Sequence, residues 1–90
     1  MSGRMYEVVL SEEARAFYAW ADRPLARKLA RCFSQLERDP RKHSNIKRLK
    51  GPWSGYFRYR VDDWRVIYRI DVTQFCVQVA SIAHRSEVYE

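Results

Sequence analysis

The segment GYFRYRVDDWRVIYRID, residues 55–71, decides the fold because it holds two alternating runs joined by a polar pair. Residues 55–61 and 64–71 each alternate apolar and polar side chains, as half-buried strands do. The Asp62-Asp63 pair has the length of a two-residue hairpin loop, although type I′ geometry suits Asn-Gly better than two aspartates. The segment therefore predicts an antiparallel β-hairpin.

The register of this hairpin sorts its side chains onto two faces. A two-residue loop pairs Val61 with Trp64 and brings Arg60 opposite Arg65. One face is then apolar and suits packing against helices: Phe57, Tyr59, Val61, Trp64, Val66 and Tyr68. The other is cationic and holds Tyr56, Arg58, Arg60, Arg65 and Arg69. Like charges placed opposite each other cost about 0.2–1 kcal/mol, so the cluster indicates a phosphate ligand, with a merely solvated face as the alternative.

The N-terminal third predicts one strand and two helices. Residues 6–10 (YEVVL) form a short strand-like run, and Ser11 is a good helix N-cap. The helical pattern restarts at Asp22-Arg23-Pro24, where the proline suits a first helical turn. The second helix ends before Asp39-Pro40, and its apolar stripe is Leu25, Leu29, Cys32, Phe33 and Leu36. Its arginines lie mostly off this stripe, on a face that is most simply read as solvated.

The rest of the chain completes a single fold. Residues 41–54 show no strong period and predict a cationic connecting loop with a turn at Gly51-Pro52, whereas residues 75–84 predict a third strand. The predicted class is α+β: an N-terminal strand, an α-helical hairpin and a three-stranded antiparallel meander, forming one mixed sheet with the helices on one face. At 90 residues, we expect one domain over residues 1–90.

The composition limits the possible partners and location. The chain has 17 Lys and Arg against 11 Asp and Glu, a net charge of +6, which favours a polyanion or an acidic protein as partner. A hydrophobic fraction of 47% excludes a disordered chain. No apolar run approaches the ~20 residues of a membrane span, and no signal-peptide core begins the chain, so we expect a cytoplasmic protein without membrane contact. Cys32 and Cys76 lack CxxC spacing, so we expect no disulfide, metal or cofactor.

Three segments in a fixed order carry a family resemblance. They are Leu49-Lys50-Gly51, the hairpin strands from Tyr59 to Ile70, and IAHRSEVY at residues 82–89. Together they span much of the chain and resemble the RelE/ParE toxin superfamily, in particular its RelE-like mRNA interferase branch. The resemblance implies a toxin of a type II toxin–antitoxin system. Such a toxin enters the ribosomal A site, cleaves mRNA by attack of the 2′-hydroxyl without a metal ion, and so inhibits translation.

The same resemblance implies the site residues. The catalytic cations fall on Arg58, Arg60, Arg65 and Arg85, and Tyr89 becomes a candidate general base because a cationic field lowers a phenol pKa. His84 competes for an acid or base role because imidazole titrates nearest to neutral pH, or it is a structural hydrogen-bonding group. Better-studied relatives have lysines in place of the two β-strand arginines, and an arginine cannot act as a base. The expected RNA-binding residues are Lys47, Arg48, Lys50, Tyr56 and Arg69.

The implied partners and two alternative functions complete the analysis. The partners are an acidic, partly disordered antitoxin, mRNA in the ribosomal A site, and operator DNA reached only through the antitoxin. A ParE-like inhibitor of DNA gyrase would instead bind its target without a nuclease site, and such inhibitors need not keep the arginine set together. A non-catalytic nucleic-acid-binding module would use the same arginines only to hold phosphates.

Overall fold

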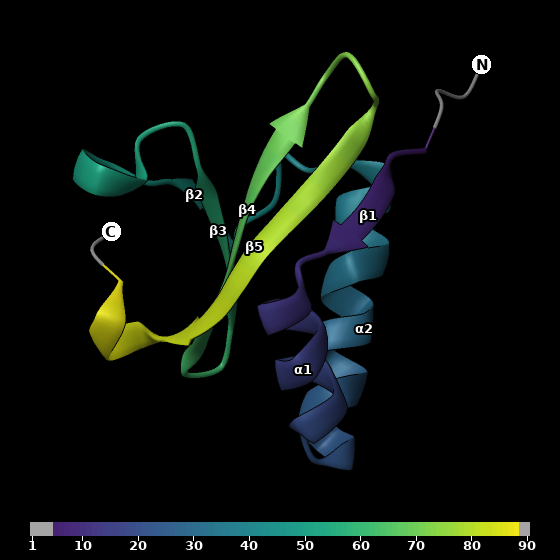
Figure 1. Cartoon of the computed structure of the whole chain (residues 1–90), viewed down its shortest axis with the longest axis vertical. Coiled ribbons are helices and arrows are strands. Elements are labelled where there is room, and N and C mark those ends of the chain that lie inside the picture. The colour runs from purple at the N-terminus through teal and green to yellow at the C-terminus, as the bar shows by residue number, and fades with distance from the viewer. Residues whose placement is uncertain (1–4, 89–90) are drawn as a thin grey trace.

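A computed structural model describes residues 5–88 and contains one mixed five-stranded sheet and two helices (Figure 1). The sheet order is β1-β5-β4-β3-β2, with β1 parallel to β5 and all other neighbours antiparallel. The predicted α+β class, with a helical hairpin on a strand meander, is confirmed. The elements along the chain are β1 (Glu7–Leu10), α1 (Glu12–Trp20), α2 (Arg23–Arg38), β2 (Ile46–Arg48), the 3₁₀ helix η1 (Gly51–Trp53), β3 (Phe57–Val61), β4 (Trp64–Asp71), β5 (Cys76–His84) and the 3₁₀ helix η2 (Arg85–Glu87).

The central β3–β4 hairpin has the register predicted from its loop. Val61 lies opposite Trp64, and Arg60 lies opposite Arg65. Of the two loop residues only Asp62 has a positive φ, 55°, so the type I′ condition is met at the first position alone. The apolar face of the hairpin is buried against both helices, and the core includes Ala14, Leu29, Cys32, Leu36, Tyr59, Val61, Val66, Tyr68, Val77, Val79 and Ile82.

Side-chain caps fix the start of each helix, as the sequence predicts. The Ser11 Oγ accepts a hydrogen bond from the Ala14 N–H at 3.0 Å and donates one to the Ala80 carbonyl of β5 at 2.8 Å. The Asp22 carboxylate accepts from the Leu25 N–H at 3.0 Å. Ser11 therefore both caps α1 and ties it to the sheet.

Replacing Ser11 by alanine is expected to lower the free energy of unfolding by about 2 kcal/mol. The change removes the cap of α1 and leaves the Ala80 carbonyl without its donor. Urea unfolding followed by circular dichroism measures the loss. Asp22→Ala is the matched control, because it removes only the N-cap of α2 and should lower the free energy of unfolding by about 1 kcal/mol. Equal losses in the two variants would show that the bond from Ser11 to β5 contributes nothing measurable.

The segment predicted as an irregular loop, residues 41–54, contains a strand that the sequence analysis missed. The strand β2 pairs antiparallel with β3, with Ile46 opposite Tyr59, and η1 follows it. Three residues are too few to show alternation, and two of the three are cationic, as is common at the edge of a sheet. The loop prediction was therefore wrong for this segment, and the antiparallel part of the sheet has four strands.

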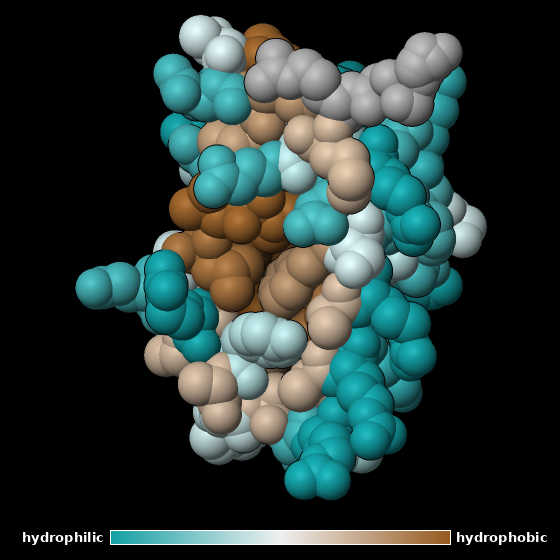
Figure 2. All heavy atoms as spheres, turned by 90° about the vertical axis from the view of Figure 1, so that its right-hand side faces the viewer, coloured by the Kyte–Doolittle hydropathy of each residue, from teal (hydrophilic) through white to brown (hydrophobic). Residues whose placement is uncertain are grey.

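The side of the molecule formed by the helices and β1 combines apolar and charged surface. Figure 2 shows apolar side chains gathered in a hollow on this side, with hydrophilic side chains along one flank. Within residues 5–88, neither helix has the length and apolar character needed to cross a bilayer. The hydrophilic flank agrees with the amphipathic pattern of α2, in which Leu29, Cys32 and Leu36 are buried while the arginines are exposed.

Candidate functional site

Arg58 and Arg60, on β3, share one neighbour in the preceding loop. Arg58 is only 5% exposed, and its Nη1 donates to the Asn45 carbonyl. Arg60 is exposed, and its Nη2 lies 3.4 Å from the Asn45 Oδ1, which accepts its hydrogen bond. The Arg60 backbone N–H also donates to the Asn45 carbonyl at 2.9 Å. Asn45 therefore organises both cations, a role for which the sequence of residues 41–54 offered no signal.

Arg65, on β4, is held against the hairpin loop. Its side chain is 8% exposed, and its Nη1 donates to the carbonyl oxygens of Asp62 and Trp64, each at 3.0 Å. Strand alternation correctly placed Arg65 and Arg58 on the cationic face, but it did not predict that both would be nearly buried. Both guanidinium groups therefore have a structural role, because their hydrogen bonds hold the Asn45 loop and the β3–β4 loop in place.

The end of β5 brings two further candidates to the same hairpin loop. His84 pairs with Trp64 across the β4–β5 ladder, and the two rings meet edge to face with centroids 5.4 Å apart. The backbone N–H of Arg85 donates to the Asp63 carbonyl at 2.8 Å, and its Nε lies 3.7 Å from the Asp63 Oδ1. This ion pair is exposed, so it contributes little to stability. The end of β5 thus lies against the β3–β4 loop.

His84 also has a local structural role. Its Nδ1 accepts a hydrogen bond from the Ser86 N–H at 3.2 Å, and its own N–H donates to the Glu87 carboxylate at 3.3 Å. These reciprocal bonds form a capping box at the start of η2. Tyr89, the expected general base, lies outside the described residues.

The expected RNA-binding residues do not form one surface. Lys47 lies opposite Arg58 on β2 and shares its face. Arg48 lies over the Phe57 ring, with its Cζ 5.4 Å from the ring centroid, and so is on the other face. Lys50 is exposed immediately before η1. Tyr56 and Arg69 line a separate cavity of about 280 Å³, together with Val9, Leu10, Ser11, Gln78, Val79 and Ala80.

The structure therefore gathers one part of the expected site and separates another. Arg60 and Arg65 share one face at the end of the sheet marked by the β3–β4 loop, and Arg85 follows β5 at the same end. The His84 ring lies at this end too, but on the opposite face, beside Trp64. Arg69 lies four residues further along β4 than Arg65, about 13 Å away along the strand. Of the five expected RNA-binding residues, Lys47 lies beside Arg58, and Arg69 lies on the same face of the sheet but nearer its other end. In residues 5–88, no group of three or more His, Cys, Asp or Glu side chains could hold a metal ion.

The two cysteines are buried and unpaired, as expected. Burial raises the pKa of the Cys32 thiol far above its ordinary value. Burial also raises the pKa of the Tyr59 phenol, with a smaller contribution from the nearby Cys32, while the Asn45 side chain opposes the shift. Both groups are therefore neutral near pH 7, and the thiol is unsuited to nucleophilic chemistry.

Solved structures that are similar to this chain include toxins and toxin–antitoxin complexes. A chain of the RelBE2 toxin–antitoxin complex from Mycobacterium tuberculosis is 24% identical with a TM-score of 0.76, over 90% of this chain and 99% of that chain. A chain of the archaeal RelE–RelB complex from Pyrococcus horikoshii OT3 is 19% identical with a TM-score of 0.79, and the match covers 93% of this chain and 99% of that chain. The YoeB/ParE toxin from Agrobacterium tumefaciens is 19% identical with a TM-score of 0.78, and the match covers 87% of this chain and 96% of that chain. These similarities show a shared fold.

Sequence comparison identifies the family. No curated protein sequence matches the chain. The family model described as the ParE toxin of type II toxin-antitoxin system, parDE, matches residues 8–89, which is most of the chain. The resemblance stated from the sequence, to the RelE/ParE superfamily, is confirmed at this level. The chain therefore belongs to the ParE toxin family of type II toxin–antitoxin systems.

Proposed function

We propose that this toxin is an endoribonuclease that cleaves mRNA in the ribosomal A site and thereby inhibits translation. The observation that carries the proposal is the gathering of Arg60, Arg65 and Arg85 around the β3–β4 loop. The strands β3 and β5 are two strand spacings apart, about 10 Å, so the exposed guanidinium groups of Arg60 and Arg85 reach the same stretch of RNA. Guanidinium groups fixed on a rigid sheet suit the binding and stabilisation of a phosphate anion.

The proposed reaction is transesterification within the RNA strand. The ribose 2′-oxygen attacks the adjacent phosphorus, the bond from phosphorus to the 5′-oxygen breaks, and a 2′,3′-cyclic phosphate and a 5′-hydroxyl remain. Negative charge grows on the phosphoryl oxygens, and we assign Arg60 and Arg85 to that charge. Arg58 and Arg65 position the Asn45 loop and the hairpin loop through their bonds to backbone carbonyls. The reaction as proposed requires neither a metal ion nor a cofactor.

His84 has a structural role in this proposal. The Ser86 backbone N–H can only donate, so the Nδ1 of His84 must accept, and a neutral ring then carries its proton on Nε2. The ring also packs against Trp64, on the face of the sheet opposite to Arg60, so in this proposal water gives the proton to the leaving 5′-oxygen. In this proposal Tyr89 removes the proton from the 2′-hydroxyl.

The proposed protein partner is an acidic antitoxin. A net charge of +6, with most arginines exposed, favours such a partner. Similar solved structures include complexes of RelE with RelB and of YoeB with YefM. We place the protein in the cytoplasm, in contact with operator DNA only through the antitoxin, because the proposed substrate is a translated message.

Inhibition of DNA gyrase is the second candidate function. The burial of Arg58 and Arg65 favours it, because folding alone explains two of the arginines that suggested a nuclease. The matched family model, which describes ParE toxins, favours it too. An inhibitor of this kind needs a binding surface and no reacting groups.

Primer extension on a translated message after toxin induction separates the two candidates. The nuclease proposal expects new 5′ ends inside codons, and no such ends on the same message with its start codon removed. Purified toxin should leave the supercoiling of a relaxed plasmid by gyrase unchanged. Intact messages together with inhibited supercoiling would replace the nuclease by the second candidate.

A further inference from the structure

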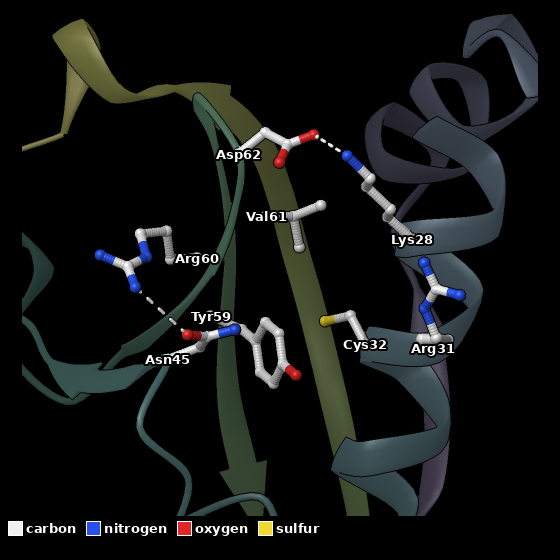
Figure 3. Close-up of a pocket in the computed structure, with 8 residues that line it drawn as sticks. All are labelled: Lys28, Arg31, Cys32, Asn45, Tyr59, Arg60, Val61 and Asp62. Atoms are coloured by element: carbon white, nitrogen blue, oxygen red, sulfur yellow. Dashed lines mark hydrogen bonds and ion pairs between the residues drawn. The ribbon is translucent and has the colours of Figure 1, made fainter. Parts of the chain in front are cut away.

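The two faces of the central sheet carry different pockets. One lies behind β3, between that strand and α2, where the ion pair of Lys28 and Asp62 closes one end at 2.7 Å (Figure 3). Figure 3 also shows that Tyr59 and Val61 lie on the side of β3 that faces α2, whereas Arg60 extends away from it. The second pocket, of about 280 Å³, lies on the open face of the sheet, which Arg60 shares and which the helices leave uncovered.

Four side chains of this open-face pocket stand in one row across the sheet. Val9 on β1 pairs with Gln78 on β5, and Gln78 pairs with Arg69 on β4. Tyr56 precedes β3, and the register of the β3–β4 hairpin places it next to Arg69. Because neighbouring residues of a strand point to opposite faces and Tyr68 lies in the core, the row points away from the helices. The row therefore stands on the same face as the β3 arginines.

The space beside this row arises from a β-bulge. The pairing of β4 with β5 shifts between Ile67 and Tyr68, which leaves Ala80 as an extra residue of β5. Ala80 lines the pocket together with Val9 and Leu10, and these side chains form its apolar part. Val9 is 42% exposed, so this apolar surface is open to a ligand. Bulges that shape a sheet in this way are common next to functional sites.

The polar part of the pocket has hydrogen-bonding capacity that the protein does not use. Within residues 5–88, neither the Arg69 guanidinium nor the Gln78 side-chain amide makes a hydrogen bond or an ion pair. The Tyr56 ring is held by an edge-to-face contact with Trp53, with centroids 5.2 Å apart. A phosphate group alone would use only the arginine, and an aliphatic side chain would use only the apolar part. A ligand that uses the whole pocket is flat, apolar on its faces and polar at its edges.

A nucleobase has this combination of properties. Bases of single-stranded RNA stack on aromatic side chains and are recognised through hydrogen bonds at their edges. Guanine fits the row best, because its O6 and N7 both accept from the fork of an arginine such as Arg69. Its N1–H can donate to the Gln78 Oε1 at the same time. Adenine presents an amino group in place of O6, and this donor opposes the donors of Arg69.

We infer that this pocket binds a guanine base of the RNA strand, with Arg69 on O6 and N7, Gln78 on N1–H and the base against Tyr56. The inference rests on the proposed nuclease function and adds to it a preference for guanine near the cut. Arg69 lies about 13 Å along β4 from Arg65, so the recognised base is displaced along the strand from the scissile phosphate. The phosphates between the two points lie over the cationic face of the sheet.

Titration of the full chain with the 2′-O-methylated pentanucleotide UUGUU tests the pocket, because this strand cannot be cleaved. NMR should show saturable shifts at the Gln78 side-chain amide and at the backbone amide of Ala80. The same strand with adenine in place of guanine should bind about tenfold more weakly, because its amino group faces the donors of Arg69. Equal affinity of the two strands would overturn the inference, as would an unshifted Gln78 amide.

Guanosine 5′-monophosphate offers the base without the strand. It should shift the same Gln78 amide but bind more weakly than the pentanucleotide, because it brings no further phosphates to the cationic face. Tighter binding of the mononucleotide than of the pentanucleotide would assign the pocket to a free nucleotide and overturn its assignment to RNA.

Two glutamines supply matched variants. Gln78→Leu removes the amide from the pocket and keeps a side chain of similar size, so the preference for guanine over adenine should fall about threefold or more. Arg69→Lys keeps the charge but loses the planar fork, and should lower the preference to a similar extent while the strand still binds. Gln74→Leu makes the same change in the exposed turn between β4 and β5 and should keep the full preference. An unchanged preference in Gln78→Leu, or an equal loss in Gln74→Leu, would overturn the inference.

Cleavage assays test the nuclease separately from the pocket. Circular dichroism should show that all three variants fold, because their side chains form no hydrogen bond within residues 5–88 that the changes would break. Cut sites mapped on a translated message should have guanine enriched at one fixed distance, and Gln78→Leu should lose this enrichment. Failure of the unaltered chain to cleave RNA would reject the nuclease and leave the guanine preference in binding standing. A cleaving chain with equal affinity for both pentanucleotides would reject the pocket alone.

Discussion

Replacing Arg60 by alanine is expected to slow cleavage of a translated message by about 10²–10³-fold, the loss that follows removal of one oxyanion donor in other enzymes. The Arg60 side chain is exposed, and its hydrogen bond to Asn45 is long, at 3.4 Å. Folding therefore depends little on this guanidinium, and a loss of cleavage rate reports on its contact with the RNA substrate. Cleavage in a cell-free translation reaction measures the effect, and growth after induction provides a second readout.

Three variants make this result specific. Arg85→Ala should reduce cleavage to a similar extent, because its ion pair with Asp63 is exposed and contributes little to folding. Arg60→Lys keeps the charge but loses the planar fork, so its cleavage rate should fall between those of the alanine variant and the unaltered chain. Arg23→Ala changes an exposed arginine at the start of α2 and should leave cleavage unchanged. A folded Arg60→Ala chain that cleaves at the full rate would remove Arg60 from the proposed site.

Arg65 and Arg58 are poorer probes of the reaction, for a structural reason. Arg65→Ala removes a side-chain donor from the carbonyl groups of Asp62 and Trp64, and Arg58→Ala removes one of the two donors to the Asn45 carbonyl. Losing such a hydrogen bond to a charged group costs about 1.5–3 kcal/mol. A loss of cleavage in these variants would therefore mix a local loosening of the loops with any direct effect on the phosphate.

The sequence predicted the hairpin register because two local rules agreed. A two-residue loop fixes which residues lie opposite each other, and only one register buries the face that includes Tyr59 and Val66. The helix starts were equally local, since Ser11 and Asp22 cap the turns that follow them. Local rules of this kind need no knowledge of distant residues.

The features that the sequence missed depend on contacts between distant segments. The strand β2 is defined by its pairing with β3 and not by its own three residues. The paired residues are nine to thirteen positions apart in the sequence, from Arg48 with Phe57 to Ile46 with Tyr59. Alternation places Arg58 on a face but does not show that the Asn45 carbonyl lies against its guanidinium. The pocket behind β3 likewise depends on where β2 stops relative to α2.

Replacing Tyr68 by alanine is expected to lower the free energy of unfolding by about 3–5 kcal/mol, as aromatic truncations in cores do. Tyr68 is fully buried, its ring stacks on Phe57 with centroids 5.5 Å apart, and its hydroxyl donates to the Pro40 carbonyl at 2.7 Å. The total free energy of unfolding of a native protein is about 5–15 kcal/mol, so this variant should be partly unfolded at 37 °C. Urea unfolding at pH 7 measures the loss.

Tyr68→Phe separates the ring from the hydroxyl and should cost about 1–2 kcal/mol at pH 7, because the buried Pro40 carbonyl loses its donor. Burial raises the pKa of the Tyr68 phenol above its ordinary value, so the folded chain keeps the proton where the unfolded chain releases it. The hydroxyl therefore makes its full contribution to the free energy of unfolding below about pH 10, which is the pKa of an unfolded tyrosine. This contribution falls as the pH rises further. The difference in unfolding free energy between the unaltered chain and Tyr68→Phe should therefore narrow from pH 9 to about pH 11. A constant difference would show that the unfolded chain does not ionise this phenol before the folded one does.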